Sequence, residues 1–251
     1  MDYLKSFDGL SIAYGVVGEE KGESAVVLHH GFASTAEINW IRPGVVEALV
    51  AAGRRVVYFD ARGHGHSDHP HEVERYADSA MARDVSALVE HLGLESFDMA
   101  GYSMGSFVTM SVAVSEARLT SCFLGGAGTG QMRVRQPEIA RLIAEALEAD
   151  DPRQVAEPSA KAFRNFADAT KQDRLALAAI QRADRASEGE EAGRIAVPVL
   201  VVNGERDTMV GEPDSLARLI PGARSLVVPG DHLSAVTRPE FRQALVDWLK
   251  R

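Results

Sequence analysis

The sequence predicts an α/β fold in which a mostly parallel, eight-stranded sheet carries helices on both faces. Short and nearly continuous apolar runs, typical of strands buried on both faces, alternate with segments of helical periodicity. This alternation is typical of βαβ units, whose helices cover a parallel sheet. The length of 251 residues suits one domain, with or without an insertion, and allows a sizeable core.

The first half of the chain supplies five predicted strands and three helices. Asp8-Gly9 is a strong turn dipeptide, so the first two strands form a hairpin. Gly53 and Gly93 follow helical segments and are typical of helix ends. The predicted strands are residues 3–7, 10–17, 25–29, 55–59 and 97–100, and the predicted helices are residues 45–52, 76–92 and 106–116.

The second half of the chain interrupts the alternation once. Residues 130–194 show no strand pattern and contain three Ala-rich helical segments, at residues 138–149, 159–169 and 172–186. We interpret residues 130–194 as a small helical insertion that divides the core into residues 1–129 and 195–251; the alternative is a set of helices that cover the sheet. The remaining predicted elements are strands at residues 119–124, 197–202 and 225–228 and a final amphipathic helix at residues 241–249.

Composition excludes several classes of partner. Acidic residues outnumber basic ones by 36 to 27, and the basic residues form no long run, so neither nucleic acid nor a membrane is an expected partner. The single cysteine, Cys122, excludes an internal disulfide and is expected to be a buried structural thiol in a reducing compartment. Residues 1–10 lack the apolar segment of a signal peptide, so we expect a cytoplasmic protein.

One pentapeptide organises the predicted chemistry. Gly101-Tyr102-Ser103-Met104-Gly105 is a G-x-S-x-G sequence between a predicted strand and a predicted helix, which is the arrangement of a nucleophile elbow. A serine held on a strained turn needs neighbours without a Cβ, so that strand and helix can pack closely around it. The turn raises the Ser103 hydroxyl above the sheet.

An activated serine needs a general base and a group that orients this base. Of the eight histidines, His232 follows a predicted strand at its carboxyl end, and Asp207 does the same after another strand. Ligands of such sheets lie beyond the carboxyl ends of the strands, so Ser103, Asp207 and His232 are expected to meet there. Their order in the chain is that of an α/β-hydrolase triad.

Three other carboxylates compete with Asp207 for the third place. Asp60 belongs to a turn motif, Asp231 is adjacent to His232 and too near to reach its far ring nitrogen easily, and Glu205 is the weakest rival.

Three motifs give the chain a resemblance to the α/β-hydrolase superfamily over its whole length. They are His30-Gly31-Phe32, residues 60–68 (Asp-Ala-Arg-Gly-His-Gly-His-Ser-Asp), and the elbow around Ser103. More closely, the chain resembles the branch with a short helical cap that includes esterases, enol-lactonases, C–C bond hydrolases and perhydrolases. The resemblance implies a site between cap and sheet.

The expected roles follow from acyl-transfer chemistry. Ser103 attacks an acyl carbonyl, His232 takes its proton, and Asp207 orients His232. The backbone amides of Phe32 and Met104 are the expected oxyanion donors. His30-Gly31-Phe32 differs from the His-Gly-Gly-Gly motif of one lipase branch, and a serine at the elbow argues against epoxide hydrolases and haloalkane dehalogenases, which carry aspartate there.

Two segments resemble sites of other kinds. Residues 64–69 match H-x-H-x-D-H, a zinc signature, but past His71 only His91 and His232 remain to complete a metal site, so we favour a tight turn and expect no metal. Residues 125–130 are rich in glycine but lack the spacing of a phosphate-binding loop, and we interpret them as a flexible entry to the cap.

Two further candidates remain open. His29 is expected to be structural or to lie at the edge of the pocket. Arg133 and Arg135, at the cap entry, offer a binding site for a substrate carboxylate or are simply solvated.

The sequence thus predicts a serine hydrolase of a small carboxylic ester that uses no cofactor. The first alternative is a lactonase or C–C bond hydrolase with the same residues. The second is a non-catalytic relative that binds a small ligand, although such a pocket needs no oriented base.

Overall fold

A single sheet forms the centre of the molecule. The computed structural model describes residues 1–18, 25–130, 137–183 and 192–250. In these residues the strands are β1 (Asp2–Lys5), β2 (Ser11–Val17), β3 (Ala25–His29), β4 (Val56–Phe59), β5 (Phe97–Tyr102), β6 (Leu119–Gly125), β7 (Val199–Gly204) and β8 (Arg224–Val228). They lie in the order β1-β2-β4-β3-β5-β6-β7-β8. The β1–β2 and β2–β4 pairs are antiparallel and all others are parallel, which confirms the predicted eight-stranded, mostly parallel sheet.

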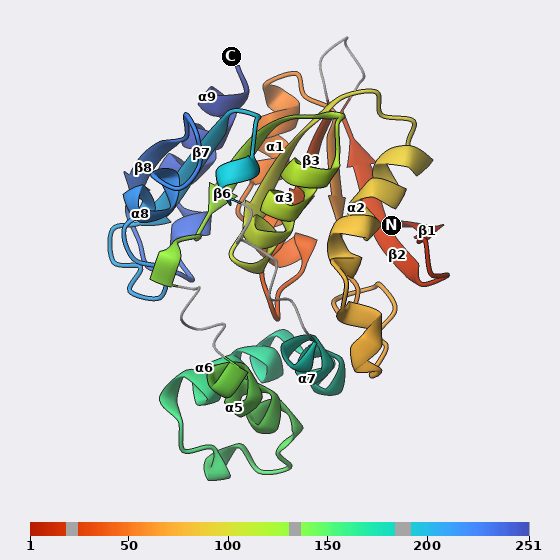
Figure 1. Cartoon of the computed structure of the whole chain (residues 1–251), viewed down its shortest axis with the longest axis vertical. Coiled ribbons are helices and arrows are strands. Elements are labelled where there is room, and N and C mark those ends of the chain that lie inside the picture. The colour runs from red at the N-terminus through yellow and green to blue at the C-terminus, as the bar shows by residue number, and fades with distance from the viewer. Residues whose placement is uncertain (19–24, 131–136, 184–191, 251) are drawn as a thin grey trace.

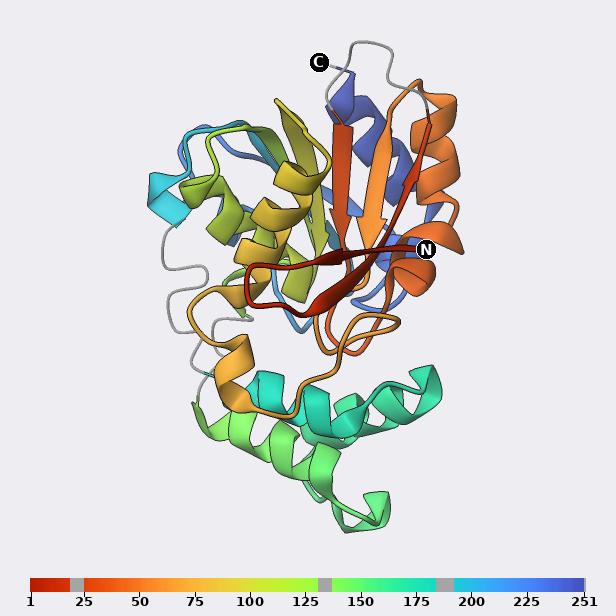
Figure 2. The ribbon, with the colours of Figure 1, turned by 90° about the vertical axis from the view of Figure 1, so that its right-hand side faces the viewer.

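Helices lie on both faces of this sheet, as predicted (Figures 1 and 2). The α-helices are α1 (Val45–Ala51), α2 (Ala80–His91), α3 (Met104–Ser115), α5 (Pro137–Glu148), α6 (Pro158–Thr170), α7 (Arg174–Arg182), α8 (Pro213–Ala217) and α9 (Pro239–Leu249). Helices α1 and α9 pack on one face, and α2, α3 and α8 on the other. No helix in the described part of the chain has the length and apolar character that crossing a membrane requires.

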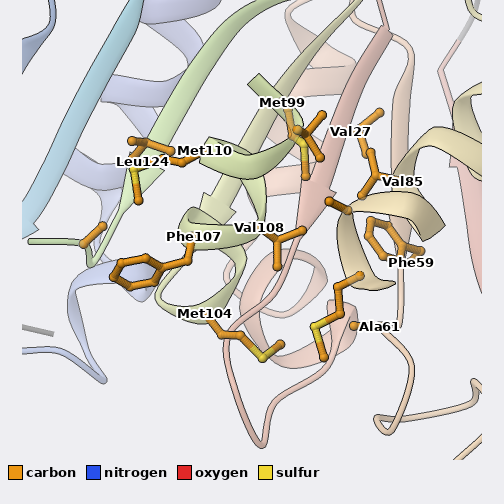
Figure 3. Close-up of a cluster of buried hydrophobic side chains, with 14 of the residues drawn as sticks. Val27, Phe59, Ala61, Val85, Met99, Met104, Phe107, Val108, Met110 and Leu124 are labelled. Carbon is orange, nitrogen blue, oxygen red and sulfur yellow. The ribbon is translucent and has the colours of Figure 1, made fainter. Parts of the chain in front are cut away.

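Strand β3 shows why the central strands contain runs of consecutive apolar residues. Val26 and Leu28 point to the face covered by α1 and α9, where they join Leu49 in one buried cluster. Val27, between them, points to the opposite face and belongs to the cluster that includes Val85 of α2 (Figure 3). Because side chains alternate along a strand, a strand covered on both faces needs apolar residues in succession.

Helices α5, α6 and α7 form a separate layer beyond the carboxyl ends of the parallel strands (Figure 1). The guanidinium of Arg164, on α6, is buried and donates to the carbonyl oxygens of Ala146 and Ala149 at the end of α5. Hydrogen bonds connect this layer to the loops after β3 and β4: the Thr170 hydroxyl donates to the Ala33 carbonyl at 2.9 Å, the Gly65 amide donates to Gln172 Oε1 at 3.0 Å, and His71 Nε2 lies 3.1 Å from Asp173 Oδ2. These contacts hold α6 above the sheet edge.

Several predicted element boundaries were wrong. Helix α2 begins at Ala80, because Asp78 and Ser79 have φ angles of 53° and 54° and interrupt the helical periodicity that starts at Tyr76. Helix α3 begins at Met104, two residues before the prediction. The short helix α8, the π-helical turn η1 (Glu37–Ile41) and the 3₁₀ turns were not predicted.

The glycine-rich segment after β6 is closely packed, so its interpretation as a flexible entry was wrong for residues 125–130. A Cβ on Gly128 would lie 2.3 Å from the Val210 carbonyl oxygen. The Asn203 side chain accepts a hydrogen bond from the Ala127 amide at 3.1 Å and donates one to the Ala127 carbonyl at 3.0 Å. Glycine is required here for close approach of two loops.

Candidate active site

Ser103 occupies the sharp turn between β5 and α3. Its φ of 53° and ψ of −113° lie in a region that non-glycine residues rarely adopt. A Cβ on Gly101 would lie 2.2 Å from the Gly105 carbonyl oxygen, and a Cβ on Gly105 would lie 2.2 Å from the His29 carbonyl oxygen. Both glycines of the pentapeptide are therefore required by close backbone packing around the serine.

Three loops bring Ser103, His232 and Asp207 together. Ser103 Oγ lies 3.0 Å from His232 Nε2, and His232 Nδ1 lies 2.8 Å from Asp207 Oδ2. The three residues follow β5, β8 and β7, so each comes from the carboxyl end of a parallel strand. The Tyr102 hydroxyl donates to the His232 carbonyl at 2.6 Å and supports the loop that carries the imidazole.

Asp207 is fixed by its own loop. Its side chain is fully buried, and its Oδ1 accepts hydrogen bonds from the amides of Met209 and Val210. The remaining oxygen, Oδ2, faces the imidazole. These hydrogen bonds fix the orientation of the carboxylate toward the His232 ring.

The rival carboxylates have other partners. Asp60 accepts hydrogen bonds from the amides of Ala36 and His66 and from the His66 ring. Asp231 accepts from Leu233 and from the amide and hydroxyl of Ser234. The exposed side chain of Glu205 pairs with Arg206.

The loop after β3 passes directly beside Ser103. A Cβ added to Gly31 would lie 3.3 Å from Ser103 Cβ. The Gly31 amide donates to Asn39 Oδ1 and the Ala33 amide donates to His64 Nε2, whereas the Phe32 amide between them has no acceptor in the described chain. Met104 is the first residue of α3, so its amide is one of those that a helix N-terminus leaves unpaired.

Three buried histidine rings hold the loops after β3 and β4. His30 Nε2 accepts from the Ala61 amide at 2.9 Å, and His64 Nε2 accepts from the Ala33 amide at 3.1 Å. The other nitrogen of each ring donates to a backbone carbonyl, and so does Nδ1 of His29. Burial lowers the pKa of all three rings, and that of His29 falls to about 3. His29 is thus a core residue and does not line the pocket.

The side chains of residues 64–69 that a metal would need have other partners. Both ring nitrogens of His64 bond to the backbone, so its single lone pair is not free for a metal, the His66 ring bonds Asp60 Oδ2, and Asp68 accepts from the Ser11 amide at 2.7 Å. Within residues 1–18, 25–130, 137–183 and 192–250, no group of three or more His, Cys, Asp or Glu side chains is arranged to hold a metal ion.

A cavity of about 430 Å³ opens beside Ser103. Helix α6 closes it from above with the side chains of Ala162, Phe163 and Phe166, and the loop after β8 contributes His232 and Leu233. Its lining residues are Gly31, Phe32, Ser34, Ile38, Asn39, Tyr102, Ser103, Pro158, Ser159, Ala162, Phe163, Phe166, Met209, His232, Leu233, Val236 and Thr237. The lining contains no Asp, Glu, Lys or Arg from the described residues.

Sequence reasoning missed most of this lining. Asn39 lies on the unpredicted π-helical turn, and the apolar residues of α6 have no pattern that separates pocket from core. π-Helical turns are rare and occur frequently at functional sites, so the turn that contains Asn39 points to this residue. The turn can be recognised only in the structure. Arg133 and Arg135 lie outside the described residues.

Comparisons with known proteins agree with the observed fold. A family model described as alpha/beta hydrolase fold matches residues 24–154, more than half of the chain. The dihydrolipoyllysine-residue acetyltransferase component of an acetoin cleaving system from Pseudomonas putida is 28% identical over 250 residues, which cover 92% of this chain and 65% of that protein. The chain thus spans about two thirds of the length of that relative. The matches to two sn-1-specific diacylglycerol lipases ABHD11, from Xenopus tropicalis and Mus musculus, span about a third of the length of those proteins.

Solved structures are similar over their whole length. An enol-lactonase from Burkholderia xenovorans LB400 is 26% identical, with a TM-score of 0.76 and coverage of 100% of both chains. A hydrolase from Pseudomonas aeruginosa PA01 is 25% identical, also with a TM-score of 0.76, and the comparison covers 100% of this chain and 98% of that one.

Proposed function

Because this chain belongs to the alpha/beta hydrolase fold family, we propose that it is a serine hydrolase that cleaves a small carboxylic ester through an acyl-enzyme on Ser103. The observation that carries the proposal is the continuous contact from Ser103 Oγ through the His232 ring to the buried Asp207 carboxylate. A pocket that only binds a ligand has no need for an oriented base beside a serine.

Acylation begins when Ser103 Oγ attacks the ester carbonyl carbon. His232 Nε2, 3.0 Å away, takes the hydroxyl proton, and Asp207 stabilises the imidazolium through Nδ1–H. The imidazolium then protonates the alcohol oxygen as the C–O bond breaks. Water attacks the acyl-enzyme in the second half-reaction, with His232 again as base, and releases the carboxylic acid and free Ser103.

The tetrahedral intermediates place negative charge on the former carbonyl oxygen. The unpaired amides of Phe32 and Met104 flank Ser103, and they are the oxyanion donors of this proposal. Each such donor typically contributes about 3 kcal/mol to stabilisation of the transition state. Because these donors belong to the backbone, side-chain substitution at residues 32 and 104 alters packing and not the donors themselves.

The cavity favours a small and uncharged substrate. A volume of about 430 Å³ is near the lower end for ligand pockets, and its described lining contains no Asp, Glu, Lys or Arg side chain. We assign residues 130–194 to a cap whose helix α6 selects the substrate.

A lactone is the second candidate substrate. The similarity to an enol-lactonase, which extends over the whole of both chains, favours this candidate. A lactone is an internal ester, so the same attack, oxyanion and proton transfers apply, and the leaving alcohol stays attached to the acyl group.

A chain-length panel of p-nitrophenyl esters tests the proposal. We expect turnover by the wild-type protein that is insensitive to chelators, with an optimum at short acyl chains. Ser103→Ala is expected to abolish this turnover and to leave the thermal unfolding transition in place. A lactone panel assayed in parallel separates the two substrate classes.

Two results contradict the proposal. Retained turnover in Ser103→Ala would show that Ser103 is not the nucleophile. Turnover that a chelator abolishes would show that the reaction depends on a metal ion. If a serine-directed phosphonate labels Ser103 but no ester is cleaved, the nucleophile stands and the substrate class is wrong.

A further inference from the structure

The polar side chains of the cavity differ in whether their hydrogen-bond donors already have acceptors. The Tyr102 hydroxyl donates to the His232 carbonyl, the Thr237 hydroxyl donates to the Ser234 carbonyl at 2.7 Å, and Ser159 is hydrogen-bonded to the Glu157 carboxylate. Outside the pair Ser103 and His232, two polar lining residues remain, Ser34 and Asn39.

The Ser34 hydroxyl has no hydrogen-bond partner. The residue is 2% exposed and lines the cavity, and its Oγ is buried without an acceptor or donor in the described chain. Buried hydroxyl groups without partners are rare, because burial removes their hydrogen bonds to water. Rotation about the Cα–Cβ bond lets this hydroxyl reach the cavity that the residue borders.

Asn39 has unused donors beside the same loop. Its Oδ1 accepts from the Gly31 amide at 2.8 Å, which fixes the orientation of the side-chain amide. Its Nδ2 makes no hydrogen bond within the described residues, although an amide nitrogen carries two donors. Asn39 Oδ1 and Ser103 Cβ lie within 3.6 Å of the position that a Cβ on Gly31 would occupy, so the amide is close to the reaction centre.

Both residues lie on the segment that follows Phe32, whose amide is the expected oxyanion donor. The leaving alcohol must contact His232, which protonates it, whereas the carbonyl oxygen points to the Phe32 amide in this proposal. We place the acyl portion of the substrate against the segment that carries Ser34 and Asn39. The Ser34 hydroxyl and the Asn39 amide are uncharged hydrogen-bond donors, so they match an uncharged oxygen acceptor on the substrate. A methylene in place of this oxygen would accept no hydrogen bond from them.

We infer that Ser34 and Asn39 form a binding site for an uncharged oxygen acceptor, such as an ether, hydroxyl or keto group, on the acyl chain near the ester carbonyl. This inference rests on the proposed ester hydrolysis. The preferred substrates are then small esters whose acyl chain carries an oxygen, and simple alkyl esters of equal size are poorer substrates.

An isosteric pair of esters tests this site. p-Nitrophenyl methoxyacetate and p-nitrophenyl butyrate differ by an ether oxygen in place of a methylene, and the ratio of their kcat/KM values is measured in each variant. Differences in intrinsic reactivity cancel when this ratio is compared between variants. We expect Ser34→Ala and Asn39→Leu each to lower the ratio about three- to tenfold, the effect of one neutral hydrogen bond.

Thr237→Val is the matched control, because it removes a lining hydroxyl that already has an acceptor, and it is expected to leave the ratio unchanged. An unchanged ratio in both Ser34→Ala and Asn39→Leu overturns the inference. So does a loss that appears only when the ether oxygen is moved to the alcohol portion of the ester.

A binding experiment tests this inference independently of ester hydrolysis. Methoxyacetamide and butyramide are titrated into Ser103→Ala by ligand-observed NMR, with and without Ser34→Ala. If the wild type cleaves neither ester, the proposed function fails, and the amides still decide the inference. Tighter binding of methoxyacetamide that depends on Ser34 supports the site, and equal binding of both amides contradicts it.

Discussion

Lowering the pH is expected to destabilise this protein well before its carboxylates are protonated. His29, His30 and His64 are fully buried, and each ring donates from one nitrogen to a backbone carbonyl. Burial lowers the pKa of each ring, to about 3 for His29. The rings therefore stay neutral in the folded protein at a pH at which the unfolded chain binds protons, so the free energy of unfolding falls as the pH falls below 6.5.

The magnitude follows from the pKa difference. Each proton that only the unfolded chain binds changes the free energy of unfolding by about 1.4 kcal/mol per pH unit. Between pH 7 and pH 5, a ring with a pKa of 6.5 in the unfolded chain and of about 3 in the folded protein, as for His29, therefore contributes about 2 kcal/mol. His30 and His64, whose pKa values burial also lowers, add to this loss in the same direction. The loss from His29 alone is a sizeable part of the total stability of a typical domain, about 5–15 kcal/mol.

Urea unfolding at a series of pH values between 7 and 5 measures this loss. His29→Leu removes one of the three rings and is expected to lower the mean slope of stability against pH between pH 7 and pH 5 by about 1 kcal/mol per pH unit. Leu28→Val, a substitution at the neighbouring buried position of the same strand that removes no titratable group, is the matched control and leaves the slope unchanged. A slope that is the same in His29→Leu and wild type would refute the reasoning.

Three other substitutions test the packing and the site. Gly101→Ala places a Cβ 2.2 Å from a backbone oxygen and is expected to cost about 3 kcal/mol of stability or more, measured by urea unfolding; a loss below about 1 kcal/mol would show that the turn adapts. Asp207→Asn is expected to lower kcat on p-nitrophenyl esters by about 10⁴ with an unchanged melting temperature, and wild-type kcat would exclude its orienting role. Arg62→Met leaves the buried Asp84 carboxylate without its 2.6 Å partner and is expected to cost about 3–5 kcal/mol in thermal unfolding, and an unchanged melting temperature would count against a structural ion pair.

The sequence was sufficient to predict the sheet and the positions of the candidate residues. Strand β3 was predicted at its observed bounds, because burial on both faces makes its first four residues apolar. The loops that carry Asp207 and His232 were predicted because each directly follows a predicted strand, and parallel strands end at the same edge of the sheet.

The pocket was not predictable in the same way. Ser34 and Asn39 lie on a segment whose course depends on contacts distant in sequence, such as the hydrogen bond between Ala36 and Asp60. The start of α2 depends on backbone angles at Asp78 and Ser79, which the apolar periodicity does not record. Ala162 of α6 lines the cavity, whereas Ala160 and Ala167 of the same helix are buried in the core cluster, so residue type does not separate the two sides of the helix.

An acyl-enzyme on Ser103 is the central claim of the proposed function, and trapping it is the most direct test. Wild-type protein mixed with excess p-nitrophenyl ester is quenched with acid within milliseconds, digested, and examined by mass spectrometry. We expect the mass of one acyl group on the peptide that contains Ser103, and no such adduct in Ser103→Ala. Ester turnover without an adduct on Ser103, or an adduct on a different residue, would contradict the account.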